Sequence, residues 1–307
     1  MRAPCKGQGG PEIMIVGRSP RIRQSFQQAW SALIALFFWD LAVTIFYFLS
    51  PFTAPALPLT IFGTALALVL GFRVNSAYQR WWEGRILWGA MVNVSRSFAR
   101  AVLAFLPDDA QARALARDLV LRHVAYVHVL RQQLRRQDAS DELYRILGKG
   151  EHGELARRNP ANAVLEGTGR RIADAQRRGW IDSIQQSRIE SMLVDMSNAQ
   201  GGMERIKNTP LPAQYRAFPK YFTRLFCILL PVGLVETLGV ATPVGSAVAG
   251  FMYLAVLQIG DDLVDPFGND VHDLPLNSIT TVIEADLNQA IDLPAPPPVE
   301  PVNGVLW

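Results

Sequence analysis

Four apolar blocks dominate the hydrophobic pattern of this chain and cover residues 27–49, 55–72, 219–238 and 243–260. About 20 helical residues cross the hydrocarbon core of a membrane, so the first block is long enough to span it. A cleaved signal peptide would have an apolar stretch of only about 7–15 residues, which disfavours that alternative. The pattern therefore predicts an all-α membrane protein with four transmembrane helices.

A second pattern, polar with apolar positions at helical spacing, fills residues 73–218 and contains no spanning segment. It predicts amphipathic helices at about 73–100, 109–136, 163–178 and 181–207. A shorter amphipathic piece follows at 277–291. Residues 73–218 and 261–292 are therefore expected to form a cytosolic helical region.

The distribution of Lys and Arg sets the expected topology. The short loops at 50–58 and 239–243 carry neither residue, whereas the N-terminal segment and residues 73–218 are rich in Arg. Positively charged loops stay in the cytoplasm, which predicts that both termini are cytoplasmic. The terminal stretches 1–13 and 293–307 are rich in Gly or Pro and are expected to be disordered tails.

Composition excludes several classes of function. The net charge is +3, with basic residues dispersed along the chain, which gives no support to nucleic-acid binding. Cys5 and Cys227 are too few for a disulfide framework. His123 and His128 are five residues apart and do not share a helical face, so we interpret them as solvated or structural. No nucleophile–base set, phosphate loop or metal spacing is present, and we predict neither an enzyme nor a cofactor or metal site.

The stretch from Pro58 to Phe98 contains no helix breaker at the point where it turns from apolar to amphipathic, which predicts one long helix. Within its apolar half, small residues recur every four positions at Gly63, Ala67 and Gly71. Such a stripe lets a neighbouring helix approach closely. The next stripe round the helix is bulkier and consists of Thr64, Leu68 and Phe72. A helix lining a narrow pore has this pattern, but so does an ordinary buried membrane helix, which the spacing alone favours.

Asp40 lies near the middle of the first apolar block. A charge at that depth is costly unless it faces protein or water. It is either a polar contact in an ion pathway or a carboxylate paired with an Arg or a hydroxyl group of a neighbouring helix. We favour the second interpretation.

Three sets of short motifs follow one another along residues 14–292. The first set is Leu70-Gly71-Phe72-Arg73, Arg80-Trp81-Trp82-Glu83 and Leu87-Trp88-Gly89; the second is Glu204-Arg205-Ile206, Thr209-Pro210-Leu211-Pro212 and Tyr215; the third is Asp265-Pro266-Phe267-Gly268 and Asp273-Leu274-Pro275-Leu276. In order and spacing they resemble the bestrophin family, and the pattern is most similar to its bacterial members.

This resemblance implies a homopentamer around one axial pore in the bacterial inner membrane. It assigns Thr64, Leu68 and Phe72 to a hydrophobic pore neck and leaves the Gly63–Ala67–Gly71 stripe for helix packing. It also implies a cytosolic constriction at Ile184. Larger apolar residues are common in the family at the position of Thr64, so the outer ring of the neck is expected to be wider and more easily wetted.

Rings of apolar side chains gate by dewetting and bind no ion strongly. The resemblance implies a passive channel for small monovalent ions that is cation-permeable, as the bacterial members are thought to be. An anion (chloride) channel of the same fold and a non-conducting, membrane-anchored interaction protein remain as alternatives. The expected partners are further copies of the chain, membrane lipid and the permeant ions.

Eukaryotic bestrophins are calcium-activated through a run of acidic residues after the fourth helix. Ca²⁺ takes six to eight oxygen ligands, and residues 266–273 of this chain lack such a run. We therefore predict no calcium clasp and interpret Asp270 and Asp273 as parts of a turn and a helix cap.

Overall fold

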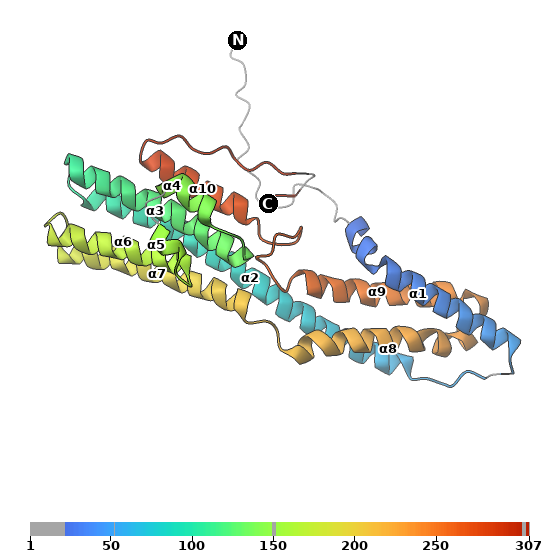
Figure 1. Cartoon of the computed structure of the whole chain (residues 1–307). Coiled ribbons are helices and arrows are strands. Elements are labelled where there is room, and N and C mark those ends of the chain that lie inside the picture. The colour runs from blue at the N-terminus through green and yellow to red at the C-terminus, as the bar shows by residue number, and fades with distance from the viewer. Residues whose placement is uncertain (1–21, 52, 149–151, 303–304, 307) are drawn as a thin grey trace, which may run out of the picture. The chain divides into compact units, whose positions relative to one another are not determined.

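A computed structural model describes residues 22–51, 53–148, 152–302 and 305–306. In this part of the chain the regular elements are helices, apart from one isolated β-bridge between Val302 and Val305. The all-α prediction is therefore confirmed (Figure 1). The helices are α1 Ile22–Leu49, α2 Leu59–Phe105, α3 Ala110–Arg135, α4 Ser140–Leu147, α5 His152–Leu155, α6 Pro160–Arg177, α7 Ser183–Asn208, α8 Ala213–Leu238, the 3₁₀ turn η2 Gly239–Ala241, α9 Thr242–Asp262 and α10 Leu276–Ala290. The predicted N-terminal tail, 1–13, lies outside the described residues.

The chain divides into two compact units. Of the described residues, the membrane unit contains those up to 82 and those from 209 to 266, and the polar unit contains those from 83 to 208 and from 267 onward. Helix α2 is continuous over 47 residues, as predicted, and contributes its first half to the membrane unit and its second half to the polar unit.

Within the described part of the chain, three segments are long and apolar enough to cross a membrane: Ala32–Leu49, a window within Leu59–Phe105, and Ala213–Asp262. The third segment is 50 residues long and consists of α8, η2 and α9, which pack against each other. Large apolar side chains such as Phe38 and Phe46 point outward from this unit. Exposed apolar surface of this extent is typical of a protein that contacts lipid. The chain is a membrane protein.

Three membrane helices start several residues away from the predicted positions. Helix α1 begins at Ile22 rather than at 27. Helix α8 begins at Ala213 rather than at 219, and both Pro219 and Pro231 lie inside it. The second apolar block becomes helical at Leu59 rather than at 55.

Capping explains where two helices of the polar unit begin. The Asp109 carboxylate accepts hydrogen bonds of 2.9 Å from the backbone N–H groups of Gln111 and Ala112 and so caps α3. Asn159 caps α6, and Pro160 occupies its first turn. The N–H groups of a first helical turn have no partner within the helix, so these side chains stabilise both starts.

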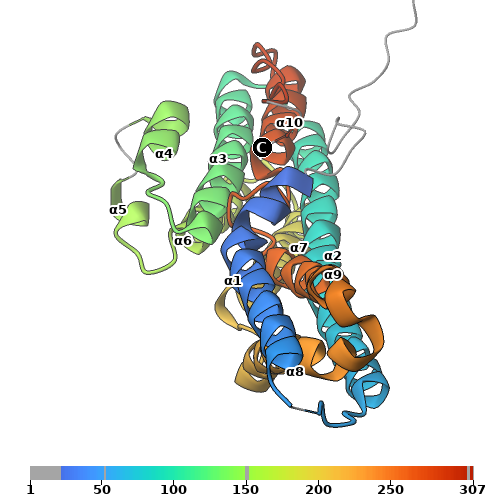
Figure 2. The same ribbon diagram turned by 90° about the vertical axis from the view of Figure 1, so that its right-hand side faces the viewer.

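The core of the membrane unit joins α2 to α8 and α9. Leu66 and Leu70 of α2 pack against Phe226 and Leu230 of α8, with partly buried side chains of α9 around them. The Tyr253 hydroxyl of α9 donates a hydrogen bond of 3.2 Å to the carbonyl oxygen of Gly63. Helix α1 packs against α8 and α9 (Figure 2). One face of α2 is thereby fixed against its neighbours.

Helix α3 is the centre of the polar unit and contacts α4, α6, α7 and α10. His123 is buried on it, with its Nε2 atom 2.7 Å from the Ser95 hydroxyl. His128 is also buried, with its Nε2 atom 2.7 Å from a Glu284 carboxylate oxygen. Both histidines are therefore structural, which was one of the two predicted roles.

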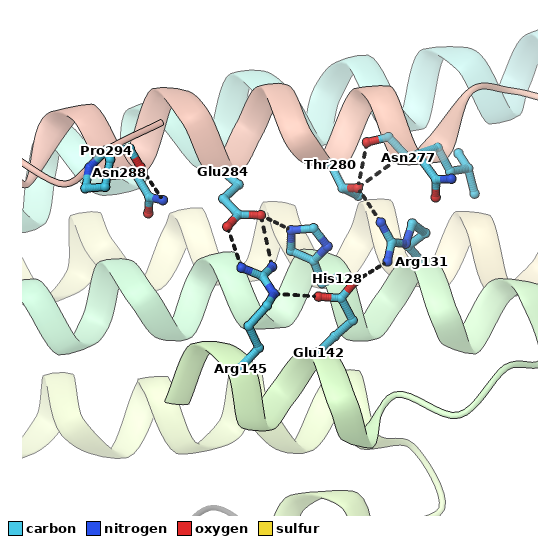
Figure 3. A network of polar contacts seen from close by, with 10 residues as sticks. His128, Arg131, Glu142, Arg145, Asn277, Thr280, Glu284, Asn288 and Pro294 are labelled. Atoms are coloured by element: carbon cyan, nitrogen blue, oxygen red, sulfur yellow. Dashed lines mark hydrogen bonds and ion pairs between the residues drawn. The ribbon is translucent and has the colours of Figure 1, made fainter. Parts of the chain in front are cut away.

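Glu284 of α10 is the hub of a polar network that ties three helices together (Figure 3). Arg145 of α4 donates to both of its carboxylate oxygens, at 2.9 and 3.1 Å. Arg145 also pairs with Glu142, which in turn accepts a hydrogen bond of 2.8 Å from Arg131 of α3. Paired charges with several hydrogen bonds are the form in which ionised groups tolerate burial. This network anchors α10 to α3 and α4.

We expect acid to destabilise the polar unit. Burial lowers the pKa of His123 from 6.5 to about 3. Burial opposes ionisation of Glu284, but hydrogen bonds from His128 and Arg145 outweigh it and lower its pKa from 4.5 to about 2. Both folded pKa values lie below the unfolded ones, so the folded state binds fewer protons. The contribution of these two groups to the free energy of unfolding is fully present above pH 6.5. The part due to His123 decreases as the pH falls below 6.5, and the part due to Glu284 decreases below 4.5.

Thermal unfolding of the detergent-solubilised protein between about pH 8 and about pH 4 checks this expectation. In the variant His123→Gln, which can still hydrogen-bond Ser95, the part of the decline that begins near pH 6.5 should disappear. A stability that rises on acidification would contradict the assignment.

Candidate ion pathway

Helix α2 has two opposite faces. Leu66, Leu70 and Arg73 lie on the buried face. Leu68 and Phe72 are both 61% exposed, and Thr64 is exposed beside them. At 3.6 residues per turn, these two sets point in opposite directions. The three residues predicted for the pore neck therefore form a contiguous exposed stripe on the side of α2 opposite its packed face.

The Thr64 hydroxyl donates a hydrogen bond of 2.7 Å to the Thr60 carbonyl oxygen of the same helix. Threonine often satisfies its hydroxyl in this way inside a helix. Because the Thr64 hydroxyl is bonded within its own helix, it is less available to water or ions. The Thr64 side chain nevertheless remains smaller than that of leucine or isoleucine.

The small-residue stripe of α2 divides into two parts. A Cβ atom added at Gly63 would lie 3.1 Å from the Tyr253 hydroxyl oxygen and 3.3 Å from the Phe226 ring, so a side chain there would require these neighbours to shift. Ala67 is exposed, and a Cβ atom added at Gly71 would meet no atom within 4 Å. Gly63 thus packs within the chain. A packing role for Ala67 and Gly71 stays a prediction.

Arg73 follows Phe72 directly, but its charge points away from the neck stripe. The side chain is 1% exposed and pairs with Asp261 at the end of α9. Asp261 also lies 3.2 Å from the Lys220 ammonium group of α8. Sequence reasoning missed this contact, because 188 positions separate Arg73 from Asp261. The sequence offered one signal for this pairing: Arg73 directly follows one apolar block, and Asp261 directly follows another.

Two residues of the family motifs, Arg80 and Glu204, each connect several segments of their own unit. Arg80 of α2 donates hydrogen bonds to the Thr209 carbonyl oxygen at 2.8 Å and to the Val264 carbonyl oxygen at 3.1 Å. These two carbonyl groups precede α8 and follow α9. In the polar unit, a single Glu204 carboxylate oxygen accepts hydrogen bonds from Gln133, Asn159 and Gln200.

Ile184, the predicted cytosolic constriction, lies in the first turn of α7 and is 73% exposed. Asp182 precedes it, and its carboxylate accepts a hydrogen bond of 2.7 Å from the Gln185 backbone N–H. Arg188 is exposed one helical turn further along. An apolar side chain thus projects outward between one acidic and one basic residue.

Asp40 is buried in the membrane unit beside the Ser246 hydroxyl of α9 and near Cys227 of α8. The hydroxyl neighbour fits the structural interpretation. However, no hydrogen bond of normal geometry reaches either carboxylate oxygen from the residues that the structure describes. Of the two expected partners, an Arg or a hydroxyl group, the described residues thus provide only a hydroxyl group as a neighbour of Asp40.

Asp270 and Asp273 lie in a turn, as predicted. One Asp273 carboxylate oxygen accepts hydrogen bonds of 2.7 Å from the backbone N–H groups of Asn269 and Asp270. The predicted helix-capping role is wrong, because the residue that precedes α10 is Pro275 and it makes no side-chain cap. Among the described residues, no three His, Cys, Asp or Glu side chains gather into a group that could hold a metal ion.

A long helix with an exposed apolar stripe, packed on its other face against further apolar helices, defines the class of helical membrane proteins. Comparison with known proteins gives the family. The family model for bacterial and fungal bestrophin proteins matches residues 22–289. The chain belongs to the bestrophin family, whose members are ion channels and not enzymes.

Individual relatives agree with this assignment. A voltage-dependent anion channel-forming protein of Mesorhizobium japonicum is 36% identical over 247 residues, which are 80% of this chain and 78% of the relative. The protein YneE of Escherichia coli K12, which has the same descriptive name, is 37% identical over 236 residues, or 76% of each chain. The crystal structure of a bacterial bestrophin homologue from Klebsiella pneumoniae matches this chain with a TM-score of 0.80 and 29% sequence identity. The match covers 85% of this chain and 97% of the Klebsiella chain.

Proposed function

We propose that this bestrophin-family channel conducts small monovalent ions passively through a pore whose neck is lined by Thr64, Leu68 and Phe72. The observation that carries the proposal is the exposure of Leu68 and Phe72 on the face of α2 opposite its packed face. Both residues lie in the apolar half of α2, which has the composition of a membrane span. A single helix cannot enclose a pore, so the neck requires further copies of the chain, and the family resemblance implies a homopentamer.

The topology that fits this proposal has four transmembrane segments, formed by α1, the first half of α2, α8 and α9. Helices α8 and α9 are joined by the three-residue turn η2, so the 50-residue apolar segment they form is interpreted as two crossings. The uncharged loops at 50–58 and 239–243 and the arginine-rich polar unit support cytoplasmic termini in a bacterial inner membrane.

Three observations bear on the choice of ion. The names of the relatives from Mesorhizobium japonicum and Escherichia coli support anion conduction over the cation permeability expected from the sequence. Asp182 lies two residues before Ile184. In an oligomer its carboxylates would form an acidic ring, which supports cation conduction. Arg188 lies on the same side as Ile184 and opposes that effect, so we give priority to anions.

Ion-substitution recordings from reconstituted protein in asymmetric NaCl decide between these ions. A reversal potential near that of chloride supports the anion channel, and one near that of sodium supports the cation channel. Protein that binds to liposomes and passes no ions would instead favour the membrane-anchored interaction protein.

Replacing Ile184 by alanine should change permeation more than stability. The side chain is largely exposed in the chain, so its truncation removes little packing. In an assembled channel it would widen an apolar constriction. Single-channel conductance and thermal unfolding are measured together. Val194→Ala, an exposed apolar change later on the same helix, is the control. If Ile184→Ala and Val194→Ala give equal conductance, Ile184 is not the constriction.

A further inference from the structure

Three basic side chains line one face of the first three turns of α8. Arg216, Lys220 and Arg224 are spaced four residues apart, so they lie above one another along about 12 Å of the helix. With Ala213, Ala217 and Tyr221 they line a hollow of about 360 Å³. The proposed ion pathway runs along α2 and α7 and leaves this face without a role.

The positive charge of this basic face is only partly compensated. The Lys220 ammonium group is 3.2 Å from Asp261, but Asp261 also pairs with the buried Arg73. Arg216 and Arg224 are exposed and form no ion pair within the described part of the chain. The hollow therefore has two guanidinium groups available for an anionic ligand.

The basic face lies where a membrane helix leaves the hydrocarbon core. After Arg224, no charged residue occurs in α8 until Glu236. Exposed aromatic side chains surround the basic residues; they are Tyr215, Phe218, Tyr221 and Phe222. Tyrosine is enriched at membrane–water interfaces, where its ring meets lipid headgroups. A ligand at this level of the helix is therefore a headgroup of the bilayer.

We propose that the basic face of α8 binds the phosphate of an anionic phospholipid, such as phosphatidylglycerol. Arginine guanidinium groups bind phosphate oxygens in a bidentate manner, and Lys220 adds a point charge between them. Basic side chains next to a membrane favour lipids with net negative charge over zwitterionic ones. The proposal depends on membrane insertion and not on conduction, so its failure would leave the channel function untouched.

The test is native mass spectrometry of the full-length protein in detergent, titrated with phosphatidylglycerol or phosphatidylcholine. Each basic residue near a membrane surface contributes about fivefold to the binding of anionic lipid. The double variant Arg216→Gln/Arg224→Gln should therefore weaken phosphatidylglycerol binding about 10- to 30-fold. Arg216→Lys/Arg224→Lys should retain most of the binding. If the double glutamine variant does not fold, Arg224→Gln alone should weaken binding about fivefold.

The matched control is Arg170→Gln/Arg177→Gln on α6, which removes the same net charge from two exposed positions of the polar unit. It should leave phosphatidylglycerol binding unchanged. The proposal is overturned if the α8 variants bind phosphatidylglycerol as tightly as the unaltered protein or if phosphatidylcholine binds equally well. Displacement of the lipid by soluble inorganic phosphate would assign the site to free phosphate instead.

Discussion

Replacing both Leu68 and Phe72 by alanine is expected to increase single-channel conductance severalfold. Both side chains are exposed on the face of α2 opposite Leu66 and Leu70, which pack in the core of the membrane unit. In an assembled neck their truncation widens the pore and lowers the free-energy cost of wetting it. Conductance of the reconstituted variant, measured in symmetric salt, gives the result directly.

The matched control is Ile45→Ala on α1, which truncates an apolar side chain of the membrane unit that is also largely exposed. Its conductance should equal that of the unaltered protein. If the Leu68→Ala/Phe72→Ala variant also has the conductance of the unaltered protein, another face of the membrane unit lines the pore.

The second large effect is expected from Glu284→Gln, which keeps the shape of the side chain and removes its charge. Glu284 is buried and accepts hydrogen bonds from Arg145. One of its carboxylate oxygens lies 2.7 Å from the Nε2 atom of His128. Breaking one partner of a buried ion pair costs about 3–5 kcal/mol. We expect the lower end, about 3 kcal/mol, because Arg145 is half exposed and keeps Glu142. Thermal unfolding should shift down by about 6–12 °C, at about 2–4 °C per kcal/mol.

Glu166→Gln serves as the control for charge removal, because Glu166 pairs with Arg170 on the surface of α6. Exposed pairs of this kind contribute about 0.5 kcal/mol or less. A shift as small in Glu284→Gln as in Glu166→Gln would show that the network around Glu284 does not anchor α10.

Local patterns predicted most of the helices, because their signals lie within a few residues of the elements they determine. The continuity of α2 follows from the absence of a breaker between Phe72 and Arg73. The start of α3 follows from Asp109, whose carboxylate reaches N–H groups only two and three residues away. The start of α8 was placed too late, because the apolar block begins only after the first turn of the helix, which contains the polar residues Gln214 and Arg216.

Contacts between distant segments were not predictable in the same way. Nothing in the sequence pairs Arg73 with Asp261 or Glu284 with His128, because each pair joins helices far apart along the chain. The neck stripe was visible as a period of four, but spacing alone did not separate it from a buried face. The family motifs favoured the Thr64–Leu68–Phe72 face, and the packing of Leu66 and Leu70 leaves that face open.

The central claim is that ions pass along the exposed stripe of α2, and cysteine accessibility tests it most directly. In a background without Cys5 and Cys227, Leu68→Cys should give currents that a charged, water-soluble thiol reagent blocks. Leu66→Cys, on the packed face of the same helix, should give currents that the reagent leaves unchanged. Unblocked current through Leu68→Cys, or block of Leu66→Cys alone, would contradict a pore lined by Thr64, Leu68 and Phe72.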